Sequence, residues 1–182
     1  MEMKWLHAQM PVEQFLANYV DVPKFLHACS QCPNYGKIGS CPPYDFDVLE
    51  YWRGFQTLQL TAVQGFIAPE ERNIEYSTEA LNAQVAKHFA VLRREMDARL
   101  EIQEQQTPQS RMLSAGKCLR CADCACAHGL PCRFPEQLRY SIESLGGDVG
   151  GLLRDLFGVN LLWAENGHLP EYFVLAGGLL TK

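Results

Sequence analysis

Residues 116–135 read GKCLRCADCACAHGLPCRFP and hold five of the eight cysteines in this chain of 182 residues. Cys118, Cys121 and Cys124 recur at three-residue spacing, and Cys132 follows after seven intervening residues. A thiolate at every third position wraps the chain around a compact anionic object, as in the cysteine runs of bacterial ferredoxins. A structural zinc site more often takes two cysteines from each of two distant turns. The stretch therefore predicts metal binding and favours an iron–sulfur cluster over zinc.

A second cysteine-rich stretch, residues 29–44, reads CSQCPNYGKIGSCPPY. Cys29 and Cys32 form a CxxC pair, and Cys41 returns after a segment rich in turn-forming residues. A redox-active CxxC usually opens a helix after a strand and needs no third cysteine. Asparagine and glycine in the turns allow backbone N–H groups to point at sulfur, which tunes a cluster's potential. We therefore interpret this stretch as a second metal-binding loop.

Composition excludes several classes of function. The formal net charge of −5, with no block of lysine or arginine, argues against nucleic-acid binding. No apolar run approaches the ~20 residues of a membrane span. Residues 1–20 lack the apolar core of a signal peptide, so we expect a cytoplasmic protein. In a reducing cytoplasm, eight cysteines are expected to serve as metal ligands rather than as disulfides.

The number of cysteines bounds the number of clusters. Three cysteines in the first loop and five in the second are enough for two fully ligated [4Fe–4S] clusters, provided that Cys126 or Cys132 reaches across to the first loop. If none does, the three cysteines of the first loop would hold a cluster with one open iron, which can act as a Lewis acid. The spacing leaves open whether there are one or two clusters and which cysteine crosses.

Three motifs then indicate a family. The chain resembles a widespread prokaryotic family of predicted metal-binding proteins of unknown function. The resemblance is carried by the patterns CxxCPNYGxxxxCPPY, GxCxxCxxC and CRFPE, the last followed a few residues later by SIESLG. The resemblance covers most of the chain and implies an iron–sulfur type of metal site with no agreed reaction. The cysteines that it implies as ligands are Cys29, Cys32, Cys41, Cys118, Cys121, Cys124 and Cys132. Cys126 looks like an addition to the motifs.

The clearest predicted helix spans residues 77–106. Its apolar side chains step by three or four residues, as expected for a helix packed on a sheet, with a dimeric coiled coil as the alternative. The stripe consists of Leu81, Val85, Phe89, Leu92, Met96 and Leu100. Alternation of apolar and polar residues from Leu58 to Ala62 predicts a half-buried strand, and residues 111–115 a short strand or turn.

The remaining patterns are less regular. We expect a helical lead-in over residues 1–28, helices near 135–145 and 152–157, and paired strands at 159–163 and 172–175. Together these elements predict one α+β domain over residues 1–182, with an antiparallel or mixed sheet packed by helices. The two cysteine-rich loops, 29–44 and 116–135, are expected to meet in the fold.

The leading functional hypothesis is a cytoplasmic iron–sulfur protein with two [4Fe–4S] clusters that passes electrons to a redox partner protein. An iron–sulfur enzyme or metal-handling protein with an open iron is the second, and a zinc-stabilised interaction module is the third. Basic residues near the second loop predict a rim that docks an acidic partner. They are Lys117, Arg120, Arg133 and Arg139. A homodimer remains an alternative.

Overall fold

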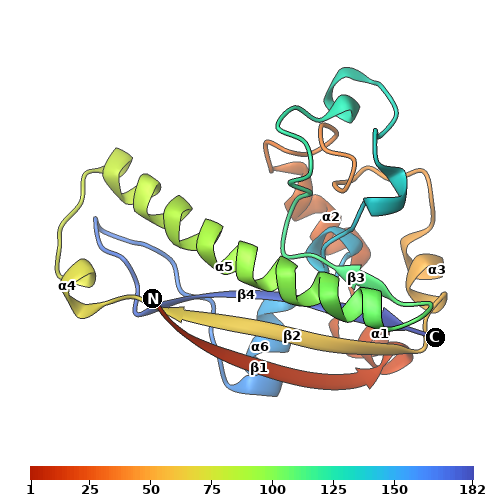
Figure 1. Cartoon of the computed structure of the whole chain (residues 1–182), viewed down its shortest axis with the longest axis horizontal. Coiled ribbons are helices and arrows are strands. Elements are labelled where there is room, and N and C mark those ends of the chain that lie inside the picture. The colour runs from red at the N-terminus through yellow and green to blue at the C-terminus, as the bar shows by residue number, and fades with distance from the viewer.

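The computed structural model describes residues 1–182 as an antiparallel sheet with helices on both faces (Figure 1). The strands lie in the order β1-β2-β4-β3, and every neighbouring pair is antiparallel. Their bounds are Glu2–Pro11 for β1, Thr57–Phe66 for β2, Arg111–Leu113 for β3 and Tyr172–Thr181 for β4. The predicted α+β class is confirmed, and the sheet is wholly antiparallel.

Six α-helices and three short 3₁₀ helices connect the strands. The α-helices are α1 (Val12–Tyr19), α2 (Val22–Ser30), α3 (Val48–Arg53), α4 (Pro69–Arg72), α5 (Thr78–Gln106) and α6 (Val149–Phe157). The 3₁₀ helices are η1 (Ala125–His128), η2 (Pro135–Gln137) and η3 (Glu143–Leu145). In Figure 1, α5 lies above the sheet, whereas α1 and α6 lie below it. None of these helices combines the length and the apolar character needed to cross a bilayer.

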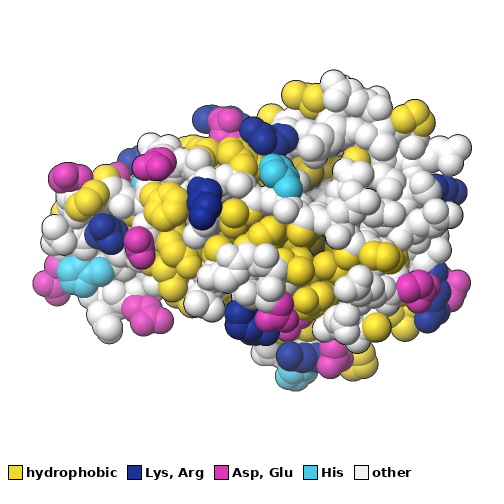
Figure 2. Space-filling view, turned by 90° about the horizontal axis from the view of Figure 1, so that it is seen from below, with side chains coloured by type: hydrophobic (Ala, Val, Ile, Leu, Met, Phe, Trp, Pro, Cys, Tyr) yellow, Lys and Arg dark blue, Asp and Glu magenta, His cyan; other side chains and the backbone are white.

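The two central strands divide the hydrophobic core into two layers. Leu58, Leu60 and Ala62 of β2 pack with α1, α3 and α6, while Val63 and Ile67 pack with α5. Because both faces are covered, β2 is buried continuously from Leu60 to Gly65 and is not the half-buried strand that the alternation predicts. Seen from below, hydrophobic side chains gather along the middle of the face and charged ones lie mostly toward its edges (Figure 2).

The long helix α5 forms as predicted. Ser77 caps its N-terminus, with its side chain accepting a hydrogen bond from the Ala80 N–H. Leu92, Met96 and Leu100 are fully buried against the sheet, and the earlier members of the stripe are partly buried there. The stripe that could have formed a coiled coil therefore contacts the chain's own sheet.

The helical lead-in predicted for residues 1–28 is wrong in its first part. Residues 2–11 form the edge strand β1, paired with β2 over its whole length. Its apolar side chains alternate between the two cores: Met3 and Trp5 contact the α5 layer, whereas Leu6, Ala8 and Met10 contact the other layer. The helical spacing belongs only to α1 and α2, where Asp21 caps α2.

Two other predictions are also wrong. Residues 135–145 form two separate 3₁₀ helices, because the chain between them bonds to the segment that follows β3, with the Ser114 N–H donating to the Tyr140 carbonyl (2.8 Å). Residues 159–163 form no strand, since β4 pairs with β2 and β3 instead. Asn166 and Gly167 do form the expected turn, both with positive φ.

Trp52 connects the core to η3, a segment that also reaches the cysteine-rich region. Its side chain is completely buried, packs on Phe15 with ring centroids 4.7 Å apart, and donates its Nε1–H to the Leu145 carbonyl (2.9 Å). Both the packing and the hydrogen bond hold η3 in place.

We expect Trp52→Phe to lower the free energy of unfolding by about 2–4 kcal/mol, since it leaves a cavity and an unpaired buried carbonyl. Urea denaturation measures this loss. Trp163→Phe is the control, because Trp163 is exposed. Equal stability of the two variants would contradict the role assigned to Trp52.

An aromatic cluster supports the chain that follows Cys41. Tyr44, Phe46, Tyr51 and Tyr140 contact one another with ring centroids 4.8–5.6 Å apart. Burial raises the pKa of Tyr51 to about 12, and it also raises the pKa values of Tyr44 and Tyr140. The cluster therefore favours neutral phenols.

The raised pKa of Tyr51 predicts a pH dependence of stability. Below pH 10 the phenol is neutral in both the folded and the unfolded chain, whereas between pH 10 and about 12 only the unfolded chain loses its proton. The free energy of unfolding should therefore fall across this window, and Tyr51→Phe should reduce the fall by about 2 kcal/mol. Urea denaturation at pH 9, 10.5 and 11.5 tests this, with Tyr76→Phe as control. Parallel profiles for wild type and Tyr51→Phe would refute the assignment.

Candidate metal centre

Cys29, Cys32 and Cys41 line one cavity of about 280 Å³. Cys29 lies in the last turn of α2, and the other two lie in the turns that follow. The Cys32 N–H donates to the Cys29 carbonyl (2.9 Å), and the Cys41 N–H donates to the Ile38 carbonyl (2.9 Å). Successive tight turns therefore bring three thiols to one space. We call it the three-cysteine cavity.

The other walls of the three-cysteine cavity come from distant parts of the sequence. Gly116 and Lys117 open the second cysteine-rich stretch, and Ser141, Glu143 and Ser144 lie in or beside η3. Burial raises the pKa values of the Cys29 and Cys41 thiols. Oε2 of Glu143 is buried and has no hydrogen-bond partner, so an unsatisfied polar atom lies in the wall of this cavity.

Four cysteines of the second stretch surround a separate, smaller space. Its volume is about 20 Å³, and Gly39 from the first loop closes one side. The cysteines are Cys118, Cys121, Cys124 and Cys132. The Cys118 N–H donates to Ser40 Oγ (2.8 Å), which connects the two loops. We call this the four-cysteine site.

Hydrogen bonds from N–H groups reach sulfur at both sites. Burial acts to raise the pKa of Cys124, but bonds from the Gly39, Cys126 and Ala127 backbone and from the Cys126 thiol outweigh it and leave the pKa lowered. The Phe134 N–H donates to Cys132 Sγ, and the Asn34 amide donates to Cys32 Sγ, both at 3.4 Å. Such bonds stabilise thiolates, the form in which cysteine binds metals.

Cys126 lines neither cavity. Its sulfur lies against Gly39, where an added Cβ would be only 2.9 Å away, and burial raises the pKa of its thiol. Cys132 lines the four-cysteine site together with the other cysteines of its own stretch. Neither of the two cysteines considered for a crossing ligand reaches the three-cysteine cavity.

The donor set fits a cysteine-bound metal group. All eight cysteines are free thiols, and seven of them surround two defined spaces with N–H donors directed at sulfur. No three Cys, His, Asp or Glu side chains converge closely enough to hold a single ion. The sulfurs of each site instead surround a space, and those of a polynuclear cluster lie farther apart than those around one ion.

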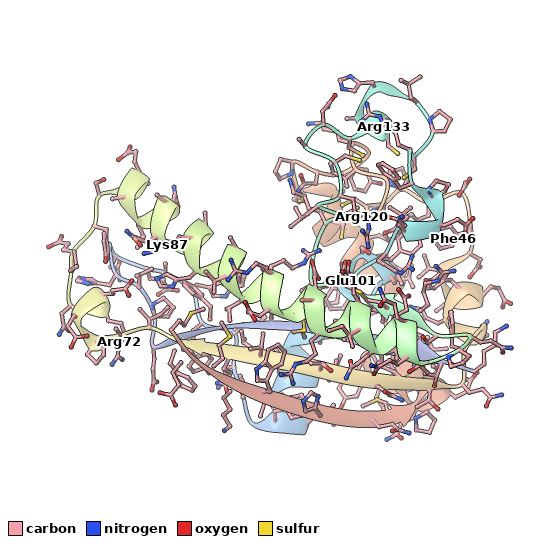
Figure 3. The ribbon with its side chains drawn as sticks, in the orientation of Figure 1. Phe46, Arg72, Lys87, Glu101, Arg120 and Arg133 are labelled. Atoms are coloured by element: carbon pink, nitrogen blue, oxygen red, sulfur yellow. The ribbon has the colours of Figure 1, made fainter.

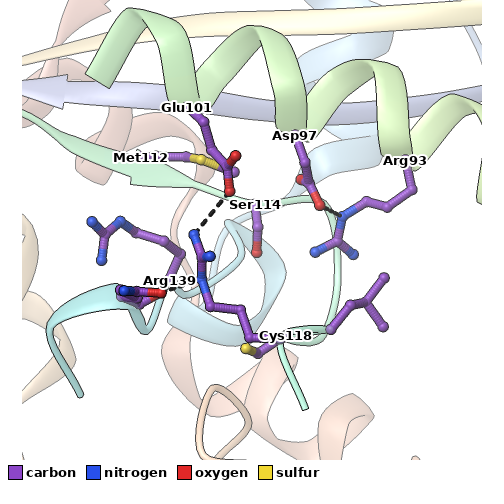
Figure 4. A pocket seen from close by; sticks show the side chains of 10 residues that line it. Arg93, Asp97, Glu101, Met112, Ser114, Cys118 and Arg139 are labelled. Carbon is purple, nitrogen blue, oxygen red and sulfur yellow. Dashed lines mark hydrogen bonds and ion pairs between the residues drawn. The ribbon is translucent and has the colours of Figure 1, made fainter. Parts of the chain in front are cut away.

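Three ion pairs with α5 carboxylates hold the chain around the second cysteine stretch in place, and those of Asp97 and Glu101 are drawn in Figure 4. Glu104 holds Arg139 through two oxygens, with the closest pair 2.8 Å apart, and Asp97 holds Arg93 at 2.6 Å. Arg93 also donates to the carbonyls of Ala115 and Lys117. The third pair joins Glu101 to Arg120 at 2.8 Å. We call these three pairs the α5 clamp, since they fix the chain where it leaves the sheet.

The α5 clamp also changes the basic rim expected from the sequence. Arg120 and Arg139 are neutralised by carboxylates of α5, so only Lys117 and Arg133 remain without an acidic partner. Figure 3 shows Arg120 extending toward Glu101, whereas Arg133 lies farther from α5, near the top of the cysteine-rich lobe. The positive charge beside the four-cysteine site is therefore smaller than the sequence indicates.

A family model described as predicted metal-binding protein (DUF2284) matches residues 17–180. The chain belongs to this family. The match runs from α1 into β4 and includes both cysteine-rich stretches, so this DUF2284 member is a predicted metal-binding protein with eight cysteines. Comparison with curated proteins and with solved structures gave no match.

Some residues of the candidate metal centre in this DUF2284 member were not predicted from the sequence. The acids of the α5 clamp, Asp97, Glu101 and Glu104, recur at four- and three-residue spacing on the polar face of the helix, a signal that could have been noticed. Glu143 lies in the SIESLG motif, but its place beside the three cysteines depends on how η3 packs.

We expect Glu104→Gln to lower the free energy of unfolding by about 1–3 kcal/mol, because it leaves the Arg139 charge partly buried and unpaired. The side chains of Arg139 and Glu104 are only 15% and 17% exposed. The control is Glu50→Gln, whose exposed pair with Arg53 should contribute less than about 0.5 kcal/mol. Urea denaturation compares them, and equal losses would contradict the clamp.

Proposed function

We propose that this protein binds two [4Fe–4S] clusters, one closed and one with an iron left free for substrate. Cys118, Cys121, Cys124 and Cys132 would hold the closed cluster. Cys29, Cys32 and Cys41 would hold the other. The observation that carries the proposal is the separation of seven cysteines into groups of four and three, each around its own space.

Electron transfer between the two centres is supported by their contact. Gly39 lies between Cys32 and Cys41 of the first loop yet lines the four-cysteine site, and Lys117 precedes Cys118 yet lines the three-cysteine cavity. The Ser40–Cys118 hydrogen bond holds these walls together. Clusters bound here would supply one-electron chemistry, and an open iron would add Lewis acidity.

A redox partner protein is the proposed source of electrons. Three apolar side chains of the second stretch, Leu119, Leu130 and Phe134, are exposed around the four-cysteine site, together with Arg133. A small patch of this kind suits a transient electron-transfer encounter. We place the function in the cytoplasm, where thiols and such clusters are kept reduced. A homodimer stays a prediction.

Zinc is a second candidate, for the four-cysteine site alone. The space there is only about 20 Å³, smaller than a cubane, and four thiolates that draw together around a single ion would fill it. In that case the protein would carry a structural zinc beside an iron–sulfur centre in the three-cysteine cavity.

Metal analysis of three cysteine variants tests the proposal. Anaerobically purified wild type should contain about eight iron and eight sulfide atoms per chain. Cys41→Ser and Cys121→Ser should each remove about four iron atoms by emptying one centre, while Cys126→Ser should retain all eight. About one zinc with four iron atoms would favour the second candidate. A chain without iron, or loss of a centre in Cys126→Ser, would overturn the assignment.

A further inference from the structure

An apolar cavity of about 490 Å³ lies where the chain leaves the sheet after β3. Its floor is Val174–Ala176 of β4, and its walls come from α2, α5 and the start of α6. Trp163, 66% exposed, and Leu161 lie in its wall on the irregular segment before β4. Its volume is that of a small-molecule site.

The cavity exists because β3 is short. The Ile67 N–H donates to the Glu171 carbonyl, so odd-numbered residues of β4 direct their backbone groups toward β2 and even-numbered ones toward β3. Pairing with β3 ends at Gly178, which leaves Val174 and Ala176 without a strand partner on that edge. Two residues are too short an edge for an added peptide strand, so the open groups favour a small ligand.

This apolar cavity adjoins the three-cysteine cavity. Gly116 and Glu143 line both, and Glu143 carries the buried Oε2 that has no partner. Burial raises the pKa of the Glu143 carboxyl group. A buried carboxyl oxygen without a hydrogen-bond partner is costly, and a ligand with an O–H, S–H or N–H group would satisfy it. The polar end of such a ligand would then lie at the entrance to the three-cysteine cavity.

The residues that line the apolar cavity indicate the charge and the shape of the rest of the ligand. Phe25, Phe89 and Trp163 offer aromatic surfaces, and no lysine, arginine or histidine lines the cavity. The second carboxylate, Asp148, is occupied as the cap of α6, where it accepts from the Gly151 N–H (2.8 Å). An anionic ligand would find no counter-charge, whereas a neutral aromatic body would bury its surface well.

We propose that this cavity binds the substrate of the three-cysteine centre, and that the substrate is a neutral aromatic molecule with one alcohol or thiol head. The head forms a hydrogen bond with Glu143 Oε2 and reaches the three-cysteine cavity, while the ring lies among Phe25, Phe89 and Trp163. The inference rests on the proposed function, because it supplies the open iron with its ligand.

The test uses anaerobically purified protein of measured iron content and 2-naphthol as the probe. Calorimetry should detect one site, with 2-naphthol bound at least tenfold more tightly than the anion 2-naphthoate or unsubstituted naphthalene. The probe should also shift the electron paramagnetic resonance signal of the reduced three-cysteine cluster. That signal is identified by its absence in Cys41→Ser.

Two variants and a control locate the site. Glu143→Gln and Trp163→Ala should each weaken 2-naphthol binding about tenfold or more, without loss of iron. Trp163 is exposed, so its replacement should not impair folding. Leu156→Ala, on the exposed side of α6 outside the cavity, should bind 2-naphthol as the wild type does.

The failures are distinguishable. Four results would each overturn the inference and leave the proposed clusters in place. They are no binding of 2-naphthol to protein with its full iron content, tighter binding of 2-naphthoate than of 2-naphthol, unchanged 2-naphthol affinity in Trp163→Ala, and an unshifted cluster signal. Absence of iron from the purified protein would instead refute the proposed function, and the inference with it.

Discussion

The shortness of β3 is the constraint on which the rest of the structure depends. The strand pairs with β4 for three residues, beside Gly177 and Gly178. A Cβ on Gly177 would lie 2.7 Å from the Leu113 carbonyl oxygen and 2.9 Å from Leu100, so only glycine allows this approach. Beyond Leu113 the chain turns away, held by Arg93 of the α5 clamp. That departure raises the second cysteine stretch above the sheet and exposes the edge of β4.

Two cavities follow from this one departure. The chain that leaves the sheet supplies Gly116 and Lys117 to the three-cysteine cavity, and the edge it leaves open forms the floor of the apolar cavity. Glu143, positioned by η3 and hence by the Trp52–Leu145 hydrogen bond, lies where the two meet. The proposed centre would need access for both electrons and a substrate. The Ser40–Cys118 hydrogen bond connects its loop to the four-cysteine site, and Gly116 and Glu143 are shared with the apolar cavity.

The sequence predicted an element correctly where a short local pattern is enough to form it. The stripe of α5 and its Ser77 cap are local, and so is the turn at Asn166–Gly167. It failed for β1 and for residues 159–163, because strand formation depends on a partner elsewhere in the chain. The continuous burial of β2 likewise results from α5 covering a face that the alternation left to solvent.

For the candidate site, the sequence by itself determined the donor chemistry: eight cysteines in two stretches, spaced for a metal group, and membership of a family of predicted metal-binding proteins. Only the tertiary structure decided their grouping into four and three, the position of Cys126 against Gly39 and outside both cavities, and the approach of Glu143. The reason is that donor type and local spacing are properties of a short segment, whereas distances between segments decide which thiols share a space. Those distances are set by the sheet, by the α5 clamp and by the point at which β3 ends.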